Sequence, residues 1–124
     1  MDDHYGSQAG DVVLQEAAAR IRDNLRPTDL LARYGGGEFA ALLPRTSQDT
    51  LQKIAKRLNA AIREQPFEYK SHIIPVTISI GGAMLTDATL SLDDLLSQAD
   101  QAMYRAKAAG RNCAVIFHPA GLED

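Results

Sequence analysis

Apolar residues along this chain recur with two periods, one typical of helices and one of strands. Three segments place them three and four positions apart, which predicts amphipathic helices. The first ends at Pro27, the second before Pro66 and the third at Gly110, all residues that stop a helix. A capping box of Ser91 and Asp94 marks the start of the third. The three apolar faces are Leu14, Ala17, Ala18, Ile21 and Leu25; Leu51, Ile54, Ala55, Leu58 and Ile62; and Leu92, Leu95, Leu96, Ala99 and Met103.

Four shorter apolar runs predict strands. Residues 30–34 and 39–43 flank three glycines, which predicts a hairpin with a flexible tip that ends at Pro44. Residues 74–80 alternate apolar and polar side chains, a pattern typical of a half-buried strand before Gly81 and Gly82. Residues 113–117 form the last predicted strand, and a polar tail follows it.

The resulting order, α–β–β–α–β–α–β, indicates one α+β domain over residues 1–124. We expect a ferredoxin-like, nucleotidyl-cyclase-palm-like architecture, in which helices flank an antiparallel-containing sheet. A ferredoxin-like unit begins with a strand, whereas this chain begins with a helix. We therefore interpret the domain as N-terminally truncated, with the first strand missing and hydrogen-bonding edges left open.

Composition narrows the class of protein. A formal charge of −3 and an isoelectric point near 5.5 provide no basic field for nucleic acid. The single cysteine, Cys113, excludes an internal disulfide and is compatible with a reducing cytosol. No apolar stretch is long enough to span a bilayer, and no signal peptide is apparent. We expect a cytoplasmic domain without direct membrane insertion.

The run Arg33-Tyr34-Gly35-Gly36-Gly37-Glu38-Phe39 carries the candidate chemistry. Consecutive glycines let backbone amides approach an anion closely, and a carboxylate beside them can hold a hard cation. Two adjacent carboxylates would be a stronger metal signal, but Gly37 precedes Glu38. The alternative is an ordinary hairpin turn with a solvated carboxylate, although a hairpin needs at most one or two glycines.

Taken together, several motifs resemble the GGDEF domain, the catalytic domain of diguanylate cyclases, along nearly the whole chain. The matching pieces are Asp3-His4-Tyr5-Gly6 with Gly10-Asp11, Arg26-Pro27-Thr28-Asp29, residues 33–39, Ile78-Ser79-Ile80-Gly81, and residues 99–107 with Gly110-Arg111-Asn112. The resemblance implies a reaction that joins two GTP molecules, one on each of two facing domains, into cyclic di-GMP and pyrophosphate. Such phosphoryl transfer needs a divalent metal, Mg²⁺ or Mn²⁺, and a triphosphate cradle.

The resemblance also implies roles for individual residues. Glu38 matches a metal-ligand carboxylate, and the residues that match GTP contacts are Gly35 and Gly36 along the triphosphate, Lys107 and Arg111 at its charges, and Asp11 at the guanine edge. Each has an alternative. Lys107 and Arg111 near a helix C-terminus could complement its dipole, worth about 0.3–1 kcal/mol each, and Asp11 could cap a helix N-terminus.

The departures from the family pattern concern the metal and the guanine. Family members carry Asp or Glu at the position of Gly37, and a second metal-binding aspartate lies on the missing first strand. Asp2 stands where the family has a guanine-contacting asparagine, and Ser7 where it has a histidine. One of three acidic metal contributors is left, so we expect this domain to be catalytically impaired.

A second site is implied by Arg26-Pro27-Thr28-Asp29, which is separated by five residues from the glycine turn. Family members with Arg-x-x-Asp at this offset bind the product cyclic di-GMP there and are inhibited. A guanidinium fork suits a guanine Hoogsteen edge or a phosphate, and Lys53 and Arg57 match further basic contacts. The alternative is a surface ion pair that contributes little.

Three hypotheses follow. The first is a GGDEF domain of bacterial cyclic di-GMP signalling that binds GTP, cyclic di-GMP or both, and regulates a fused sensor or phosphodiesterase domain. The second is a fragment of an active diguanylate cyclase that works as a homodimer with another GGDEF domain. The third is a structural module for dimerisation. Gly37 argues against the second, and the retained pairs Arg26/Asp29 and Lys107/Arg111 argue against the third.

Overall fold

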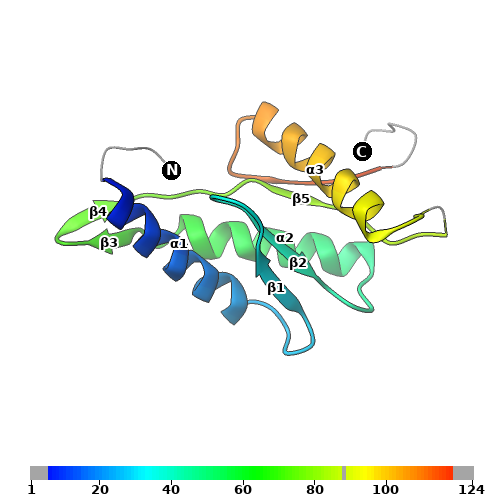
Figure 1. The fold of residues 1–124 in the computed structure, drawn as a ribbon, viewed down its shortest axis with the longest axis horizontal. Helices are drawn as coiled ribbons and strands as arrows, with labels where there is room; N and C mark the ends of the chain where they lie inside the picture. The colour runs from blue at the N-terminus through cyan, green and yellow to red at the C-terminus, as the bar shows by residue number, and fades with distance from the viewer. Residues whose placement is uncertain (1–5, 88, 119–124) are drawn as a thin grey trace.

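The computed structural model describes residues 6–87 and 89–118, drawn as a ribbon in Figure 1. In this part of the chain the helices are α1 (Gly6–Asp23), α2 (Gln48–Arg63) and α3 (Leu92–Ala108). The strands are β1 (Leu30–Arg33), β2 (Phe39–Leu42), β3 (Phe67–Tyr69), β4 (His72–Ile74), β5 (Ile80–Gly82) and β6 (Ala114–Ile116). The mixture of helices and short sheets confirms the predicted α+β class.

The predicted helix ends are confirmed for α3. The Ser91 hydroxyl accepts a hydrogen bond from the Asp94 amide at 3.1 Å, and the Asp94 carboxylate accepts one from the Leu90 amide at 3.3 Å. Gly110 follows the helix with φ +116°, a left-handed conformation that favours glycine. The first helix begins at Gly6, close to the N-terminus as the sequence predicts.

The strands form three separate pairs within the described residues. β1 and β2 are antiparallel, with Arg33 opposite Phe39 at the glycine turn. β3 pairs antiparallel with β4, and β5 pairs parallel with β6. No strand precedes α1 in the described ranges, and β2 and β5 each pair on one side only. Whether a further strand belongs beside β2 or β5 stays a prediction.

The predicted single strand over residues 74–80 is wrong. Ile74 instead ends β4, the second strand of a hairpin with β3, and residues 75–79 are irregular up to the start of β5 at Ile80. Lys70 and Ser71 form the tight turn of the hairpin with φ +47° and +72°, a geometry usually signalled by Asn-Gly, so the turn could not be recognised. Pro75 has no amide hydrogen for a ladder, and β4 accordingly ends at Ile74.

The main core lies between α1, α2 and the β3–β4 hairpin. Its buried members are Ala9, Val13, Ala17, Ile21, Ile62, Phe67 and Ile74. The β1–β2 hairpin adds Leu31 and Phe39 from one face, while the cross-strand pair Leu30 and Leu42 on the other face is exposed. The core thus holds one face of the hairpin and leaves its tip in solvent.

Arg20 joins three elements at the edge of this core. Its guanidinium lies 3.8 Å from the centre of the Phe67 ring and pairs with Glu16 at 2.6 Å. It also donates to the carbonyls of Ala61 at 3.2 Å and Gln65 at 2.6 Å. These carbonyls lie at the C-terminal end of α2, where backbone acceptors lack partners within the helix. Arg20 therefore fastens α1 to the end of α2 and to β3.

A glycine sets the position of α3. Figure 1 shows α3 on one side of β5 and α2 on the other, and both helices contact the β5–β6 pair. A Cβ atom at Gly81 would lie 2.1 Å from the Ala99 carbonyl oxygen and 2.2 Å from the Met103 backbone nitrogen. The helix backbone therefore rests directly on the strand at Gly81.

We predict that Gly81→Ala lowers the free energy of unfolding by at least about 2 kcal/mol, because the helix backbone must move away from the strand. Gly36→Ala is the matched control, since a Cβ atom at Gly36 meets nothing within 4 Å. Urea unfolding followed by circular dichroism measures both. Equal unfolding midpoints for the two variants would contradict the close packing of α3 on β5.

Candidate functional site

The glycine turn between β1 and β2 is closed by two hydrogen bonds. The Tyr34 amide donates to the Glu38 carbonyl at 2.7 Å. The Arg33 guanidinium donates to the Gly36 carbonyl at 3.1 Å. Gly35, Gly36 and Gly37 are exposed and Glu38 is half-buried. The turn is thus held at its base while its three glycines face solvent.

Only one of the three glycines is required by the backbone. Gly35 has φ +94°, a conformation that side chains rarely adopt. Gly36 and Gly37 do not have positive φ, and a Cβ atom at either would meet nothing within 4 Å. The local backbone conformation therefore does not require glycine at position 37. The turn has room for a side chain at Gly37, the position where the resemblance leads us to expect a carboxylate.

The metal-binding capacity of the described residues is small. No group of three or more His, Cys, Asp or Glu residues there is arranged to hold a metal ion. Glu38 is the one carboxylate within the glycine turn itself. Mg²⁺ is usually held by one or two carboxylates together with substrate phosphates. The described residues therefore do not form a protein-held metal centre, and Glu38 offers a single ligand to an ion that a nucleotide would share.

The other predicted GTP contacts lie on separate elements. Asp11 is exposed inside α1, so its alternative role as a helix N-cap is wrong. Lys107 is exposed in the last turn of α3. Arg111 lies beyond the helix with φ +65°, and its amide donates to the Ala106 carbonyl at 3.0 Å. Among the described residues, no hydrogen bond or ion pair joins these three side chains to the glycine turn, and their roles stay predictions.

Two predicted departures fall where the structure gives no account of the side chain. Asp2, aligned with the guanine-contacting asparagine, lies outside the described residues. The side chain of Ser7 also lies outside the described part.

Arg26 and Asp29 form a closed network at the other end of the hairpin. The Asp29 side chain has 0% exposure, and it accepts from the Arg26 amide at 2.8 Å and from the Arg26 guanidinium at 2.9 Å. The same guanidinium nitrogen donates to the Pro44 carbonyl at 2.8 Å and to the Thr46 hydroxyl at 2.7 Å. The pair therefore joins the turn before β1 to the loop after β2.

The network also fixes the charge state of the pair. Hydrogen bonds from Arg26 lower the pKa of the Asp29 carboxyl, and the Asp29 hydrogen bond raises the pKa of Arg26. An aspartate with a lowered pKa favours the folded state above the unfolded value, about 3.9, and this contribution is lost as pH falls through the folded-state pKa. Asp29 is therefore a buried carboxylate that Arg26 keeps ionised.

The two other residues of the predicted cyclic di-GMP site lie nearby on α2. The Arg57 guanidinium donates a short hydrogen bond to the carbonyl of Asn24, two residues before Arg26. Lys53 lies one helical turn earlier on α2, is exposed, and makes no ion pair with a described residue. Arg57 therefore connects α2 to the chain just before Arg26, and this region carries three basic side chains.

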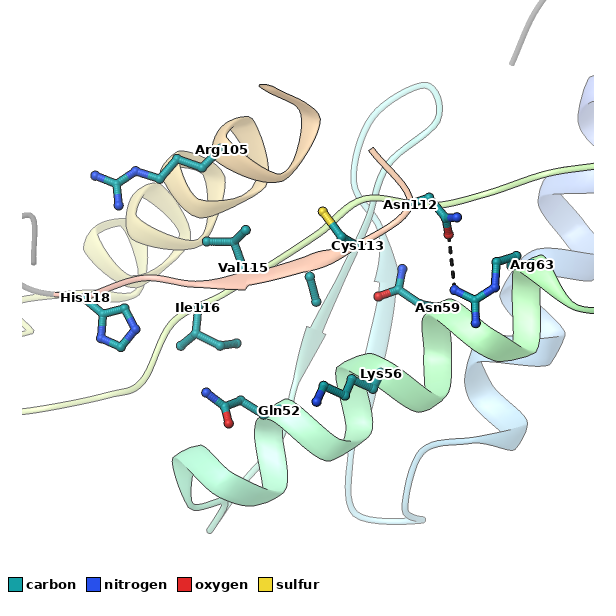
Figure 2. A pocket seen from close by; sticks show the side chains of 11 residues that line it. Gln52, Lys56, Asn59, Arg63, Arg105, Asn112, Cys113, Val115, Ile116 and His118 are labelled. Atoms are coloured by element: carbon teal, nitrogen blue, oxygen red, sulfur yellow. Dashed lines mark hydrogen bonds between the residues drawn. The ribbon is translucent and has the colours of Figure 1, made fainter. Parts of the chain in front are cut away.

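Sequence reasoning missed a cleft of about 690 Å³ between α2 and β6, shown in Figure 2. Gln52, Lys56, Asn59 and Arg63 line it from α2. Their spacing of three and four residues is that of one helix face, but a polar face is ordinarily read as solvated. None of the predicted site residues lines this cleft.

In the described residues, no helix is both long and apolar enough to cross a membrane.

Comparison with known proteins identifies the family. The model of the family described as "Diguanylate cyclase, GGDEF domain" matches residues 1–113. The chain is 40% identical over 112 residues to the diguanylate cyclase DgcP of Pseudomonas aeruginosa, an alignment of 90% of this chain and 16% of that protein. It is 38% identical over 117 residues to the response regulator PleD of Caulobacter vibrioides, covering 93% of this chain and 26% of PleD. The chain spans less than a third of either relative.

Solved structures agree with the sequence matches. The GGDEF domain of DgcB from Caulobacter crescentus, in complex with c-di-GMP, has a TM-score of 0.86 at 28% identity, over 92% of this chain and 68% of that chain. A GGDEF-only form of YfiN from Pseudomonas aeruginosa has a TM-score of 0.87 at 37% identity, over 94% and 68%. These likenesses confirm the predicted palm-like fold. The chain belongs to the GGDEF family of diguanylate cyclase domains.

Proposed function

We propose that this domain works in cyclic di-GMP signalling as a nucleotide-binding GGDEF domain with impaired cyclase activity. The observation that carries the proposal is the glycine turn, where exposed glycines remain but Glu38 is the one carboxylate. A turn of this kind binds phosphate through backbone amides. With one acidic ligand in place of several, it does little to neutralise the charge that develops on a leaving pyrophosphate.

The binding half of the proposal assigns a task to each retained residue. Gly35 and Gly36 present backbone amides to the triphosphate, and Lys107 and Arg111 neutralise its charge. Both basic side chains are exposed and make no ion pair with a described residue. Asp11 accepts hydrogen bonds from the guanine edge. Mg²⁺ or Mn²⁺, when bound with GTP, supplies charge neutralisation, and Glu38 is the side chain that contacts it.

The regulatory half concerns Arg26. Its Nη2 atom is engaged by Asp29, Pro44 and Thr46, whereas its Nη1 atom makes no hydrogen bond to a described residue. The network therefore holds the guanidinium rigid with one nitrogen available, which lowers the entropy lost on binding. We infer that cyclic di-GMP binds here through its phosphates and guanine edge, with Arg57 and Lys53 as further cations. Contact with Asp29 itself would require the Arg26–Asp29 pair to open.

The cellular setting follows from the same proposal. GGDEF chemistry joins one GTP from each of two facing domains, so a homodimer with another GGDEF domain would be needed for any residual turnover. A domain that binds nucleotide without turnover acts through a fused sensor or phosphodiesterase domain. Such a domain would work in the cytoplasm, where GTP is available.

The first prediction is that this chain makes no cyclic di-GMP from GTP with Mg²⁺ or Mn²⁺, because one carboxylate does not hold the catalytic metal. Chromatography of an overnight reaction measures the product, with DgcP as the positive control. A cyclic di-GMP peak above the no-protein control would show that the domain is an active cyclase and would refute the impaired reading.

The second prediction concerns the position of Gly37. Gly37→Asp should tighten Mn²⁺–GTP binding about tenfold, the effect of roughly 1.4 kcal/mol from one added metal ligand. Its unfolding free energy should change by less than about 0.5 kcal/mol, because the site is exposed and open. Gly37→Asn is the matched control of equal size and no charge. If both variants bind Mn²⁺–GTP equally, the missing carboxylate is not what weakens the site.

The third prediction tests the cyclic di-GMP site by titration calorimetry. Arg57→Ala and Lys53→Ala should each weaken binding about fivefold, because a charge-assisted contact to phosphate is lost. Lys56→Ala is the control, since Lys56 lies on the side of α2 that lines the cleft with β6. Arg26→Ala is unsuitable alone because it removes the guanidinium donors of the buried Asp29 carboxylate and leaves it the backbone amide of residue 26. Indistinguishable heats for wild type and Arg57→Ala would remove the site.

A further inference from the structure

We propose that the free edge of β6 is a docking site for a partner protein, which adds an acidic extended segment to the β5–β6 sheet as a third strand. The site is the cleft between α2 and β6 in Figure 2. It is distinct from the glycine turn and from the Arg26 network, because it shares no lining residue with either.

The backbone of β6 presents hydrogen-bonding groups that no other described strand uses. The Ile80 amide donates to the Cys113 carbonyl at 2.9 Å, and the Phe117 amide donates to the Gly82 carbonyl at 2.7 Å. Alternate residues of a strand point their backbone groups to opposite sides. Since Cys113 and Phe117 face β5, the amides and carbonyls of Ala114 and Ile116 face away from it. In the described part of the chain, β6 pairs with β5 alone.

The cleft lies between two elongated elements, the helix α2 and the strand β6. Figure 2 shows α2 running alongside β6, with Asn112 beside Arg63 at one end and His118 toward Gln52 at the other. An extended peptide that pairs with Ala114 and Ile116 would lie between the strand and the polar face of α2. Strand addition of this kind takes affinity from backbone hydrogen bonds and specificity from the side chains beside them.

The charge of the lining selects an acidic segment. Lys56, Arg63 and Arg105 line the cleft, and none of the described lining residues is Asp or Glu. Lys56 makes no ion pair with a described residue, and Arg63 contacts Glu64 at 3.2 Å and Asn112 at 3.4 Å. Lys56 and Arg63 are seven residues apart, about 10 Å along a helix. Carboxylates at every second position of a strand, about 7 Å apart, are within reach of both side chains.

Asn59 lies on the same face of α2 and lines the cleft. The residue is 5% exposed, and its side-chain amide nitrogen donates to the Ile78 carbonyl at 3.0 Å. This hydrogen bond connects the face of α2 that lines the cleft to the segment before β5.

The lining disfavours other occupants. A second copy of this cleft would bring the same cations into contact, so like charges would oppose self-pairing. A polyanion such as a nucleic acid would satisfy the cations but leave the backbone groups of Ala114 and Ile116 unpaired. A polypeptide with carboxylates meets both demands.

The probe for the test is an eight-residue peptide, capped at both ends, that alternates threonine with glutamate. On titration into the whole chain, amide NMR shifts should concentrate at β6, and saturation should slow hydrogen exchange of the Ala114 and Ile116 amides at least tenfold. Lys56→Glu should weaken binding at least fivefold. Lys53→Glu, a reversal of charge outside the cleft, is the matched control and should weaken it less than twofold.

Two further probes separate the proposal from simple charge attraction. The same peptide with N-methyl groups at alternate residues should bind at least fivefold more weakly, because it cannot pair with the strand. An oligothymidylate of equal charge should not protect the Ala114 and Ile116 amides. Equal binding of the N-methylated peptide, absence of shifts at β6, or tighter binding of the oligothymidylate in the cleft would each overturn the proposal.

Discussion

The ion pair between Arg26 and the buried Asp29 carboxylate is the contact that joins the two ends of the glycine hairpin. Asp29 immediately precedes β1, and Pro44 and Thr46 follow β2. The Arg26 guanidinium therefore makes hydrogen bonds to both segments at the open end of the hairpin. Arg57 connects α2 to Asn24 just before this point. Among the described residues, the glycine turn at the opposite end makes hydrogen bonds only within itself and to Arg33 at its base. The hairpin is therefore anchored at its base and exposed at its tip, as a binding loop on a rigid scaffold requires.

This arrangement links the two nucleotide sites of the proposed function. A ligand that touches Arg26 acts on the base of the same hairpin whose tip carries the glycines. If binding opens the Arg26–Asp29 pair, the start of β1 and the end of β2 lose the contact that joins them. The close contact of Gly81 with α3 sets the position of that helix. Since α3 carries Lys107, the contact also positions one of the proposed triphosphate-binding side chains. The glycine turn and Lys107, both parts of the proposed GTP site, are therefore positioned by different contacts: the Arg26–Asp29 network and the packing of α3 on Gly81.

Patterns that rest on local physics were predictable from the sequence, whereas contacts between distant segments were not. The helix faces, the Ser91 cap, the Gly110 stop and the glycine hairpin all follow from periodicity and turn chemistry. The β3–β4 hairpin was missed because Lys70 and Ser71 adopt positive φ without the usual residues. The role of Arg20 and the cleft beside β6 depend on residues 40 or more positions apart, such as Arg20 with Ala61 and Arg63 with Asn112. The position of Gly37, which decides the functional reading, was identified from sequence, and the structure adds that its backbone does not demand glycine.

The central claim is that the glycine turn binds GTP without turning it over, and phosphorus NMR of GTP with Mg²⁺ reports both events in one sample. The account predicts that the GTP phosphate resonances shift on addition of the domain, that Lys107→Ala reduces the shift, and that no pyrophosphate resonance appears. A growing pyrophosphate signal, or phosphate resonances that the domain leaves unchanged, would contradict it.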